Sequence, residues 1–332
     1  MSTGKIGVIA ALPFTVLTLL VFAYFAVLMH ARSIPVNAGA EPLVVSIPSG
    51  ASFRRISTEM SRQTDLADPR WFRMVFYSTD YPANALRAGE FEVPSNTSLG
   101  GLIELLMSSP PYQHRFTVPE GISYLDLRYA LQSNQVLVDS VLPETQSALG
   151  YLPETYFFER GITRGQLLRR METSFIDTVE EIWQSRSRDL AISSIEELVI
   201  LASIIEKETG VTSERDLVSA VFHNRLRAGM RLQSDPTVIY AVAGDAGLDR
   251  PISKADLAYQ HPYNTYRVKG LPPGPICLPG KDALFAAAHP AAVAYRYFVA
   301  DGIGGHRFAE DLKGHNQNVA LYRAYQKQQK EN

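Results

Sequence analysis

The sequence predicts an α+β fold in three parts: a single N-terminal transmembrane helix, a small α+β module and a larger mixed α+β domain. Three observations lead to this prediction. An uncharged apolar stretch opens the chain. Short alternating apolar segments precede helical spacing in residues 42–108, and long helical patterns alternate with Gly- and Pro-rich segments in residues 109–332. A length of 332 residues allows roughly two or three domains.

Composition narrows the class of protein. Hydrophobic residues make up 46% and charged residues 20%, as in folded globular proteins. The net charge is −2 without a long run of one sign, so we expect no nucleic-acid partner. The sequence has one cysteine, Cys277, which excludes a disulfide within it and a multi-cysteine metal site. We expect this thiol to be buried.

Residues 6–29 carry no charge, and as a helix they would be about 36 Å long, enough to cross a ~30 Å hydrocarbon core. We therefore predict a cytoplasmic tail at residues 1–5, a transmembrane helix at 6–30 and a linker at 31–41. The alternative is a cleaved signal peptide, since residues 38–40 resemble a cleavage site. The apolar run is longer than the 7–15 residues typical of such peptides, which favours the anchor.

A short pattern occurs three times after an alternating apolar segment, at residues 47–53, 93–99 and 118–124. Each copy predicts a strand, a tight turn and the start of a helix. Gly50 and Asn96 stand where the turn needs a left-handed backbone. A serine two residues later can accept the first free N–H groups of the helix. The expected capping residues are Ser52, Ser98 and Ser123.

Helical periodicity dominates the rest of the chain. Long helices are predicted at residues 164–187, 196–209 and 215–228, short helices at 254–258 and 282–288, a strand at 295–300, and a last helix at 318–328. Residues 245–280 are rich in Gly, Pro, Tyr and Asn. Long irregular stretches inside a compact domain are usually binding loops, so we expect one here.

Glu208 continues the apolar stripe of the helix predicted at 196–209. At about 100° per residue from Leu201, Ile205 falls at about 40° and Glu208 at about −20°. Glu206 falls at about 140°, and residues two apart do not share a helix face. The two carboxyl groups therefore have different surroundings, and Glu208 is the one we expect to be desolvated.

A carboxyl group in an apolar wall has a raised pKa, which suits a general acid. Two structural roles for Glu208 remain open at this point. It could form an ion pair with Arg215 or Arg225, or it could end the stripe in solvent.

The sequence shows no motif for a metal site, a serine hydrolase or a phosphate-binding loop. The histidines show no HExxH-type spacing, and we find neither a G-x-S-x-G elbow nor a Gly-rich phosphate loop, so we predict no metal and no cofactor. Residues 263–266 join two tyrosines to Asn264. Such a surface can bind sugars through ring stacking and amide hydrogen bonds, although tyrosine-rich loops more often only pack.

Long motifs in the second half of the chain carry a resemblance to a known family. They are residues 201–209, 213–215, 221–226, 230–240, 263–266, 270–276, 286–290, 297–302, 305–308 and 315–316. In sequence and order they resemble the YceG-like endolytic murein transglycosylases, over nearly the whole chain. The sequence departs from the family at Cys277, where Asn is common, and at Gly314, where an acidic residue is frequent.

The resemblance implies a LysM-like subdomain at residues 42–108 and a YceG-like catalytic domain at 109–332. It implies cleavage of the bond between N-acetylmuramic acid and N-acetylglucosamine inside nascent peptidoglycan strands, which leaves 1,6-anhydro ends and limits strand elongation. The implied location is the bacterial inner membrane, single-pass, with the C-terminal domain in the periplasm. Peptidoglycan synthases and penicillin-binding proteins are the implied protein partners, beside the glycan strands.

The resemblance also implies site residues. The family's catalytic glutamate lies in the segment 206–208, and the helical phase assigns it to Glu208, with Glu206 as the alternative. We expect substrate contacts from Gln233, Asp235, Asn264, Tyr266 and His306. Arg225 and Thr237 would support the site from behind, and His315 could also line the groove.

Three other interpretations of the function remain. A muramidase would hydrolyse the same bond, with Glu206 or Asp235 as second carboxylate. A membrane-anchored peptidoglycan-binding scaffold would use the LysM-like unit without catalysis. The third is a metal-free protease, which the sequence disfavours because it shows no nucleophile–base pair.

Overall fold

The computed structural model describes residues 4–145 and 150–331. The chain divides into two compact units. The small unit comprises Met1–His114 with Phe157–Arg160, and the large unit comprises Arg115–Tyr156 with Gly161–Asn332. Both combine helices with two-stranded sheets, so the mixed α+β class is confirmed.

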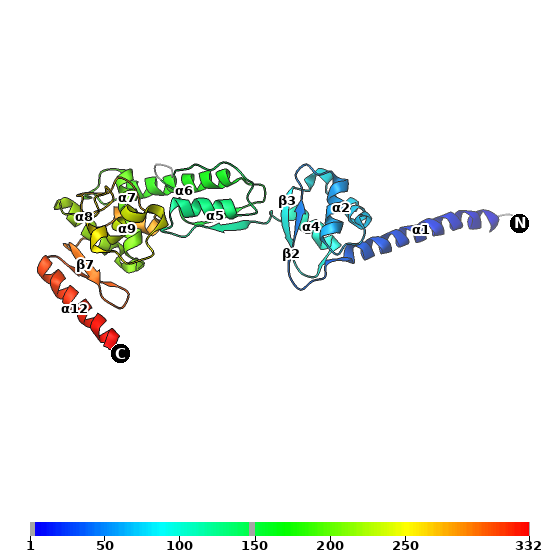
Figure 1. Ribbon diagram of the computed structural model, residues 1–332. Coiled ribbons are helices and arrows are strands. Elements are labelled where there is room, and N and C mark those ends of the chain that lie inside the picture. Colours follow the sequence, from blue (N-terminus) through cyan, green and yellow to red (C-terminus); the bar gives the residue numbers. More distant parts are fainter. Residues whose placement is uncertain (1–3, 146–149, 332) are drawn as a thin grey trace. The chain divides into compact units, whose positions relative to one another are not determined.

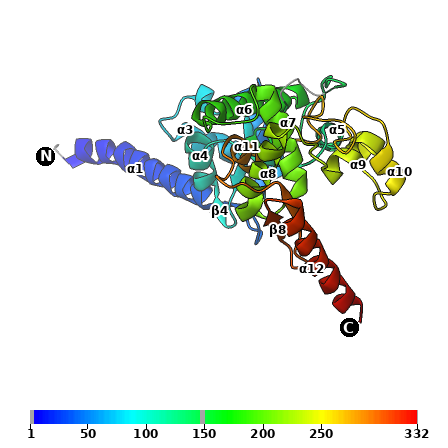
Figure 2. The ribbon, with the colours of Figure 1, turned by 90° about the vertical axis from the view of Figure 1, so that its left-hand side faces the viewer.

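The first helix, α1 (Gly4–Ser33), extends away from the rest of the small unit (Figures 1 and 2). Its segment Phe14–Ser33 has a mean hydropathy of 2.1 and is long and apolar enough to cross a membrane. The C-terminal end of this segment also contributes to the core of the small unit, because Leu28 and Ala31 are buried there.

The small unit has a strand–helix–helix–strand centre. Strands β2 (Leu43–Ile47) and β3 (Gly89–Val93) pair antiparallel. Between them lie α2 (Phe53–Gln63), α3 (Pro69–Tyr77) and the short 3-10 helix η1 (Ala83–Ala85). The flanking elements are β1 (Pro35–Asn37), which pairs antiparallel with β4 (Thr97–Ser98), and α4 (Leu99–Ser108).

Residues 31–41, expected as a linker, are instead built into this unit. They contain β1, and the side chain of Val36 is fully buried. Asn37 holds the segment in place because its side-chain amide donates to the Glu41, Val93 and Pro94 carbonyls. The composition of the segment suggested a linker, but strand pairing to β4 decides its structure.

The three repeated turns form as predicted. Gly50, Asn96 and Gly121 take positive φ angles of 70°, 59° and 75°. The side chains of Ser52, Ser98 and Ser123 accept backbone N–H groups at the starts of α2, α4 and α5 (Tyr124–Ser133). The local chemistry of each copy therefore sets the same strand-to-helix turn.

The large unit contains most of the helices. Its elements after α5 are α6 (Arg164–Ser185), α7 (Ile195–Glu208), η2 (Thr212–Glu214), α8 (Arg215–Arg227), α9 (Asp235–Ala243), η3 (Gly244–Ala246), α10 (Lys254–Ala258), α11 (Lys281–Ala288), the antiparallel hairpin β7 (Tyr297–Ala300) and β8 (His306–Ala309), and α12 (Leu312–Glu331). The unit boundary falls within the two-stranded pair of β5 (His114–Thr117) and β6 (Thr155–Phe158). The last helix begins six residues earlier than predicted, and the other predicted helices agree within two residues.

Helix α7 forms the centre of the large unit. It packs against α6, α8, α9 and α11 (Figure 2), and every side chain from Leu198 to Ile205 is buried. Cys277 is buried beside it, as expected, with its Sγ 3.3 Å from the Ser203 carbonyl oxygen. Because α7 is enclosed in this way, the positions of the residues after Ile205, in the last turn of the helix, are fixed.

Candidate active site

The C-terminal turn of α7 carries the candidate acid. Leu198, Leu201 and Ile205 have no exposed surface, so the stripe predicted from the sequence is the buried face of the helix. Glu208 continues that stripe as the last helical residue and is half-buried. Thr209 ends the helix in an extended conformation, with its N–H bonded to the Ile205 carbonyl.

Glu208 lies at the wall of a cleft of about 450 Å³. The walls come from α7, α8, the start of α9, the loop around Tyr266, strand β7 and the start of α12. The lining residues are Glu208, Arg225, Gln233, Asp235, Tyr266, Tyr297, Phe298, Val299, Leu312 and His315.

Burial raises the pKa of Glu208 to about 7. The Asp235 carboxylate adds to this rise, and the Ser234 hydroxyl and the Arg225 cation oppose it. No salt bridge to Glu208 lies within residues 4–145 and 150–331. A carboxyl group with this pKa can both donate and accept a proton near neutral pH.

Arg225 is a fixed cation at the back of the cleft. Its guanidinium donates to the Arg296 carbonyl from Nε, at 2.6 Å, and to the Leu232 carbonyl from Nη1. The group also lies 5.5 Å from the centre of the Tyr297 ring. Because backbone carbonyls hold it, Arg225 acts on Glu208 through its charge rather than through an ion-pair contact.

Gln233 and Asp235 lie on either side of buried Ser234, and both are exposed in the cleft wall. Gln233 has a positive φ of 49°, an uncommon conformation for a residue with a side chain. The Thr265 carbonyl accepts the N–H of Gln233 at 3.2 Å, which holds this turn. The Tyr266 hydroxyl donates to Asp235 at 2.7 Å and fixes the carboxylate.

Two predicted substrate contacts lie elsewhere. Asn264 has no exposed surface, and its side-chain amide donates to the carbonyls of Asp256, Leu257 and Tyr259. It organises the loop that presents Tyr266 and does not line the cleft. His306 is likewise absent from the cleft lining, and its backbone N–H and Nδ1 both bond to Glu214.

The structure thus brings six residues named from the sequence together in the cleft lining: Glu208, Arg225, Gln233, Asp235, Tyr266 and His315. It adds Tyr297, which the sequence did not indicate and whose ring stacks on that of His315 with ring centres 5.2 Å apart. The strand at 295–300 was predicted, but the side chains of the observed strand, Tyr297–Ala300, are all half-buried, so no alternation indicates which of them meets the cleft.

Glu206 has different surroundings. Its side chain is only 8% exposed, its Oε2 accepts the Gly280 N–H at 3.1 Å, and its Oε1 lies 3.8 Å from Arg215. Arg215 also pairs with Asp282 at 2.9 Å. Glu206 is therefore a partner in contacts that join α7, α8 and the start of α11, and it is absent from the cleft lining.

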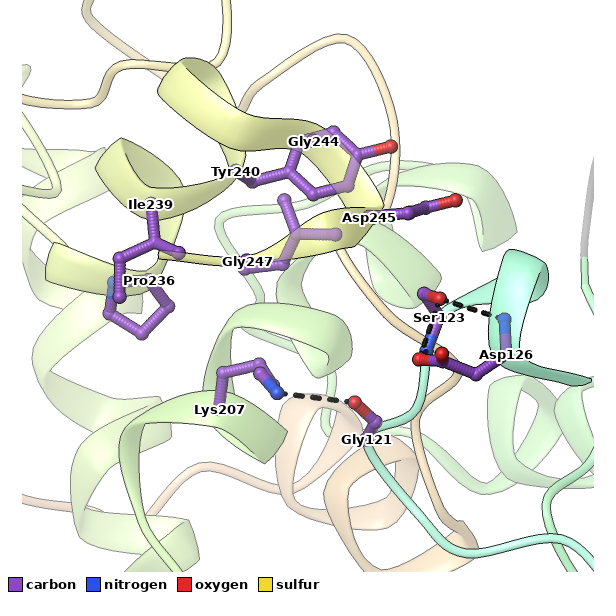
Figure 3. Close-up of a pocket in the computed structure, with 11 residues that line it drawn as sticks. Gly121, Ser123, Asp126, Lys207, Pro236, Ile239, Tyr240, Gly244, Asp245 and Gly247 are labelled. Atoms are coloured by element: carbon purple, nitrogen blue, oxygen red, sulfur yellow. Dashed lines mark hydrogen bonds between the residues drawn. The ribbon is translucent and has the colours of Figure 1, made fainter. Parts of the chain in front are cut away.

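A second, smaller hollow of about 190 Å³ lies beside Lys207 (Figure 3). Lys207 Nζ donates to the Gly121 carbonyl at 3.2 Å, and the Ser123–Asp126 capping box forms another part of the wall. Three consecutive residues thus have three different surroundings. Glu206 lies in an ion-pair network, Lys207 lines this hollow, and Glu208 lines the cleft. Of the three, only Glu208 lines the cleft.

The cleft thus combines one desolvated carboxyl group, that of Glu208, with amide, hydroxyl and aromatic side chains. The chain belongs to the YceG-like family, whose pattern matches residues 45–321.

Relatives of known name support this assignment. The chain is 28% identical over 319 residues to an endolytic murein transglycosylase of Bacillus subtilis, covering 87% of each chain. It is 27% identical to an endolytic murein transglycosylase of Streptococcus pneumoniae, covering 86% of this chain and 60% of that one. A YceG-like protein of Listeria monocytogenes has a crystal structure with a TM-score of 0.50 and 25% identity, covering 84% of this chain and 99% of that chain.

Proposed function

We propose that this protein is an endolytic murein transglycosylase, a lytic enzyme that cleaves peptidoglycan glycan strands internally and without water. Membership of the YceG-like family and the names of its bacterial relatives support this activity. The observation that carries the proposal is Glu208, a carboxyl group whose pKa is raised by burial to about 7 at the wall of a polar cleft.

One carboxyl group suffices for the reaction. Protonated Glu208 donates its proton to the oxygen between N-acetylmuramic acid and N-acetylglucosamine, and the C1–O bond breaks. Positive charge develops at C1, where the acetamido group of the sugar can stabilise it. The C6 hydroxyl oxygen then bonds to C1, and its proton passes to the Glu208 carboxylate. The products are a free hydroxyl end and a 1,6-anhydro end, and the acid is restored.

Gln233 and Tyr266 are proposed to hold the sugar, because both line the cleft with Glu208. The stacked pair Tyr297 and His315 offers ring faces to a pyranose across the same cleft. Asp235 is proposed to orient Tyr266 through their hydrogen bond.

A hydrolytic muramidase is the second candidate, and one observation favours it. Asp235 shares the cleft with Glu208 and could activate a water molecule. The two reactions differ in their products, because hydrolysis leaves a reducing end that contains an oxygen atom from water.

We further propose that the enzyme is anchored in the inner membrane through α1, with its remaining units in the periplasm. The length and hydropathy of Phe14–Ser33 support the anchor. The β2–α2–α3–β3 order supports a LysM-like role for the small unit in binding glycan. An anchored enzyme cuts strands close to their synthesis, near peptidoglycan synthases and penicillin-binding proteins, and so limits strand length.

The test is mass spectrometry of products from purified glycan strands digested in ¹⁸O-labelled water. We expect internal fragments with 1,6-anhydro ends and no ¹⁸O from the wild type, and none of these fragments from Glu208→Gln. Reducing ends labelled with ¹⁸O would establish the muramidase instead. A folded wild-type protein that yields no fragments would contradict both activities and favour a binding scaffold.

A further inference from the structure

Ser234 stands at the start of α9 but does not cap it. A serine at this position normally accepts a backbone N–H from the first turn of the helix. Among the described residues, five other helices begin with a serine that does so: Ser52, Ser98, Ser123, Ser194 and Ser253. The hydroxyl of Ser234 is therefore not bonded to its own helix.

The local sequence removes one of the two usual capping bonds. Pro236 occupies the second helical position and has no N–H to offer. Thr237 follows, and its hydroxyl donates to the Ser234 carbonyl at 2.7 Å. The Ser234 N–H is bonded to the Thr265 hydroxyl at 3.0 Å. The backbone of Ser234 is thus fixed by two threonines while its side chain is left free.

The free hydroxyl is deeply buried. Ser234 is 1% exposed, and its Oγ has no hydrogen-bond partner among the described residues. A buried hydroxyl without a partner is unfavourable and calls for an explanation. Its neighbours in the chain, Gln233 and Asp235, both lie in the cleft wall with Glu208.

The Glu208 carboxyl is the group on which this hydroxyl acts. The Ser234 hydroxyl opposes the rise in the pKa of Glu208, although the two do not form a hydrogen bond in this structure. The residues on either side of Ser234 line the cleft together with that carboxyl. The other charged or titratable groups around Glu208 are Arg225 from α8, Asp235 from α9, Tyr266 from the loop, and Tyr297 and His315 from β7 and α12.

We propose that Ser234 is a positioning residue for Glu208: its hydroxyl donates a hydrogen bond to the carboxylate that exists between the two proton transfers. This inference rests on the proposed function. Once Glu208 has given its proton to the leaving oxygen, the carboxylate accepts the Ser234 O–H on one oxygen. The other oxygen stays turned to the C6 hydroxyl and receives its proton. Ser234 itself neither gains nor loses a proton.

The test compares Ser234→Ala with a matched control, Ser219→Ala. Ser219 lies on α8, has no exposed surface, and also has an Oγ without a partner among the described residues, but it is not among the groups that shift the pKa of Glu208. We expect Ser234→Ala to lower kcat roughly threefold to tenfold. Because the lost donor favoured the ionised carboxyl, the alkaline limb of the pH–rate profile should move to higher pH. Ser219→Ala should leave both unchanged.

A second readout does not depend on activity. The Glu208 carboxyl can be titrated by ¹³C NMR without substrate, and its pKa should rise in Ser234→Ala. An unchanged pKa, or an equal rise in Ser219→Ala, would overturn the role of Ser234. If Ser234→Ala does not fold, Ser234→Gly serves instead, since glycine is tolerated at the start of a helix. Failure of the proposed function would show differently, as wild-type protein without anhydro products.

Discussion

The last turn of α7 carries two carboxyl groups, one on each side, and their surroundings differ. On one side Glu206 accepts the Gly280 N–H and lies near Arg215, so its charge is matched by groups from neighbouring elements. On the other side Glu208 faces a cleft without a salt bridge among the described residues, and burial raises its pKa. The comparison teaches that two carboxyl groups on one helical turn can differ in whether neighbouring groups match their charge, and burial raises the pKa of the one without a salt bridge in the described part of the chain.

The largest expected effect separates these two carboxyl groups directly. Glu208→Gln should lower the rate of glycan cleavage roughly 100- to 10,000-fold, because an amide cannot donate the proton. Glu206→Gln should change the rate less than about tenfold, since its amide oxygen can still accept the Gly280 N–H. Rates are measured on purified strands, with circular dichroism to verify folding. Equal losses in both variants would remove the distinction.

Asn264→Ala should act on stability. It removes three hydrogen bonds to backbone carbonyls inside the loop that presents Tyr266, at a cost of about 2–4 kcal/mol. Urea denaturation measures the loss, with exposed Gln233→Ala as the control that leaves stability unchanged. A variant of Asn264 that keeps full stability but loses substrate affinity would mean that Asn264 contacts the glycan after all.

Glu206→Ala should also destabilise the fold, by about 1–3 kcal/mol, because it leaves the Gly280 N–H and one side of Arg215 without their acceptor. Asp282 still pairs with Arg215, which limits the loss. Thermal unfolding gives the change, and the pH–rate profile should keep its wild-type shape. A shifted profile would indicate that Glu206 takes part in proton transfer.

The pH dependence sharpens the comparison further. Activity requires protonated Glu208, so the rate should fall as pH rises through about 7. Burial raises the pKa of Glu208 in the folded state, so the protonated group favours folding below its unfolded pKa, and this contribution is lost as pH rises through about 7. Glu208→Gln should therefore gain stability over wild type as pH rises. Parallel stability curves for the two proteins would contradict this assignment.

Tyr266→Phe should give the smallest effect, a roughly twofold to tenfold loss of kcat/KM. It removes only the hydrogen bond to Asp235 and keeps the ring in the cleft. Steady-state kinetics measure the loss, and Tyr263→Phe is a control in a ring that does not line the cleft. Unchanged kinetics would show that the Asp235 contact does not orient a group used in binding.

Local chemistry explains what could be predicted from the sequence. The serine-capped turns and the stripe of α7 depend on neighbours in the chain, so the turn residues Gly50 and Asn96 and the buried face ending at Glu208 were predictable. Contacts between distant segments were not. Val36 is buried because β1 pairs with β4, and Asn264 is enclosed by its own loop, although its residue type suits sugar binding.

The cleft itself depends on such distant contacts. Tyr297 and His315 reach it only because β7 packs beside α8 and α12 packs on the hairpin of β7 and β8, and nothing in the local pattern of β7 marks Tyr297 as a lining residue. Ser234 carries a weak signal, since the proline two positions later forbids one of the usual capping bonds. That signal gains meaning only when the hydroxyl is seen buried and unpartnered among the described residues.

The central claim is that Glu208 is the desolvated acid, and its titration tests this most directly. Protein labelled with ¹³C at the glutamate carboxyl carbons is titrated by NMR beside Glu208→Gln, which identifies the resonance. The account predicts one carboxyl signal that titrates at about pH 7 and is absent from Glu208→Gln. A Glu208 resonance that titrates in the ordinary range of exposed glutamates would contradict the account.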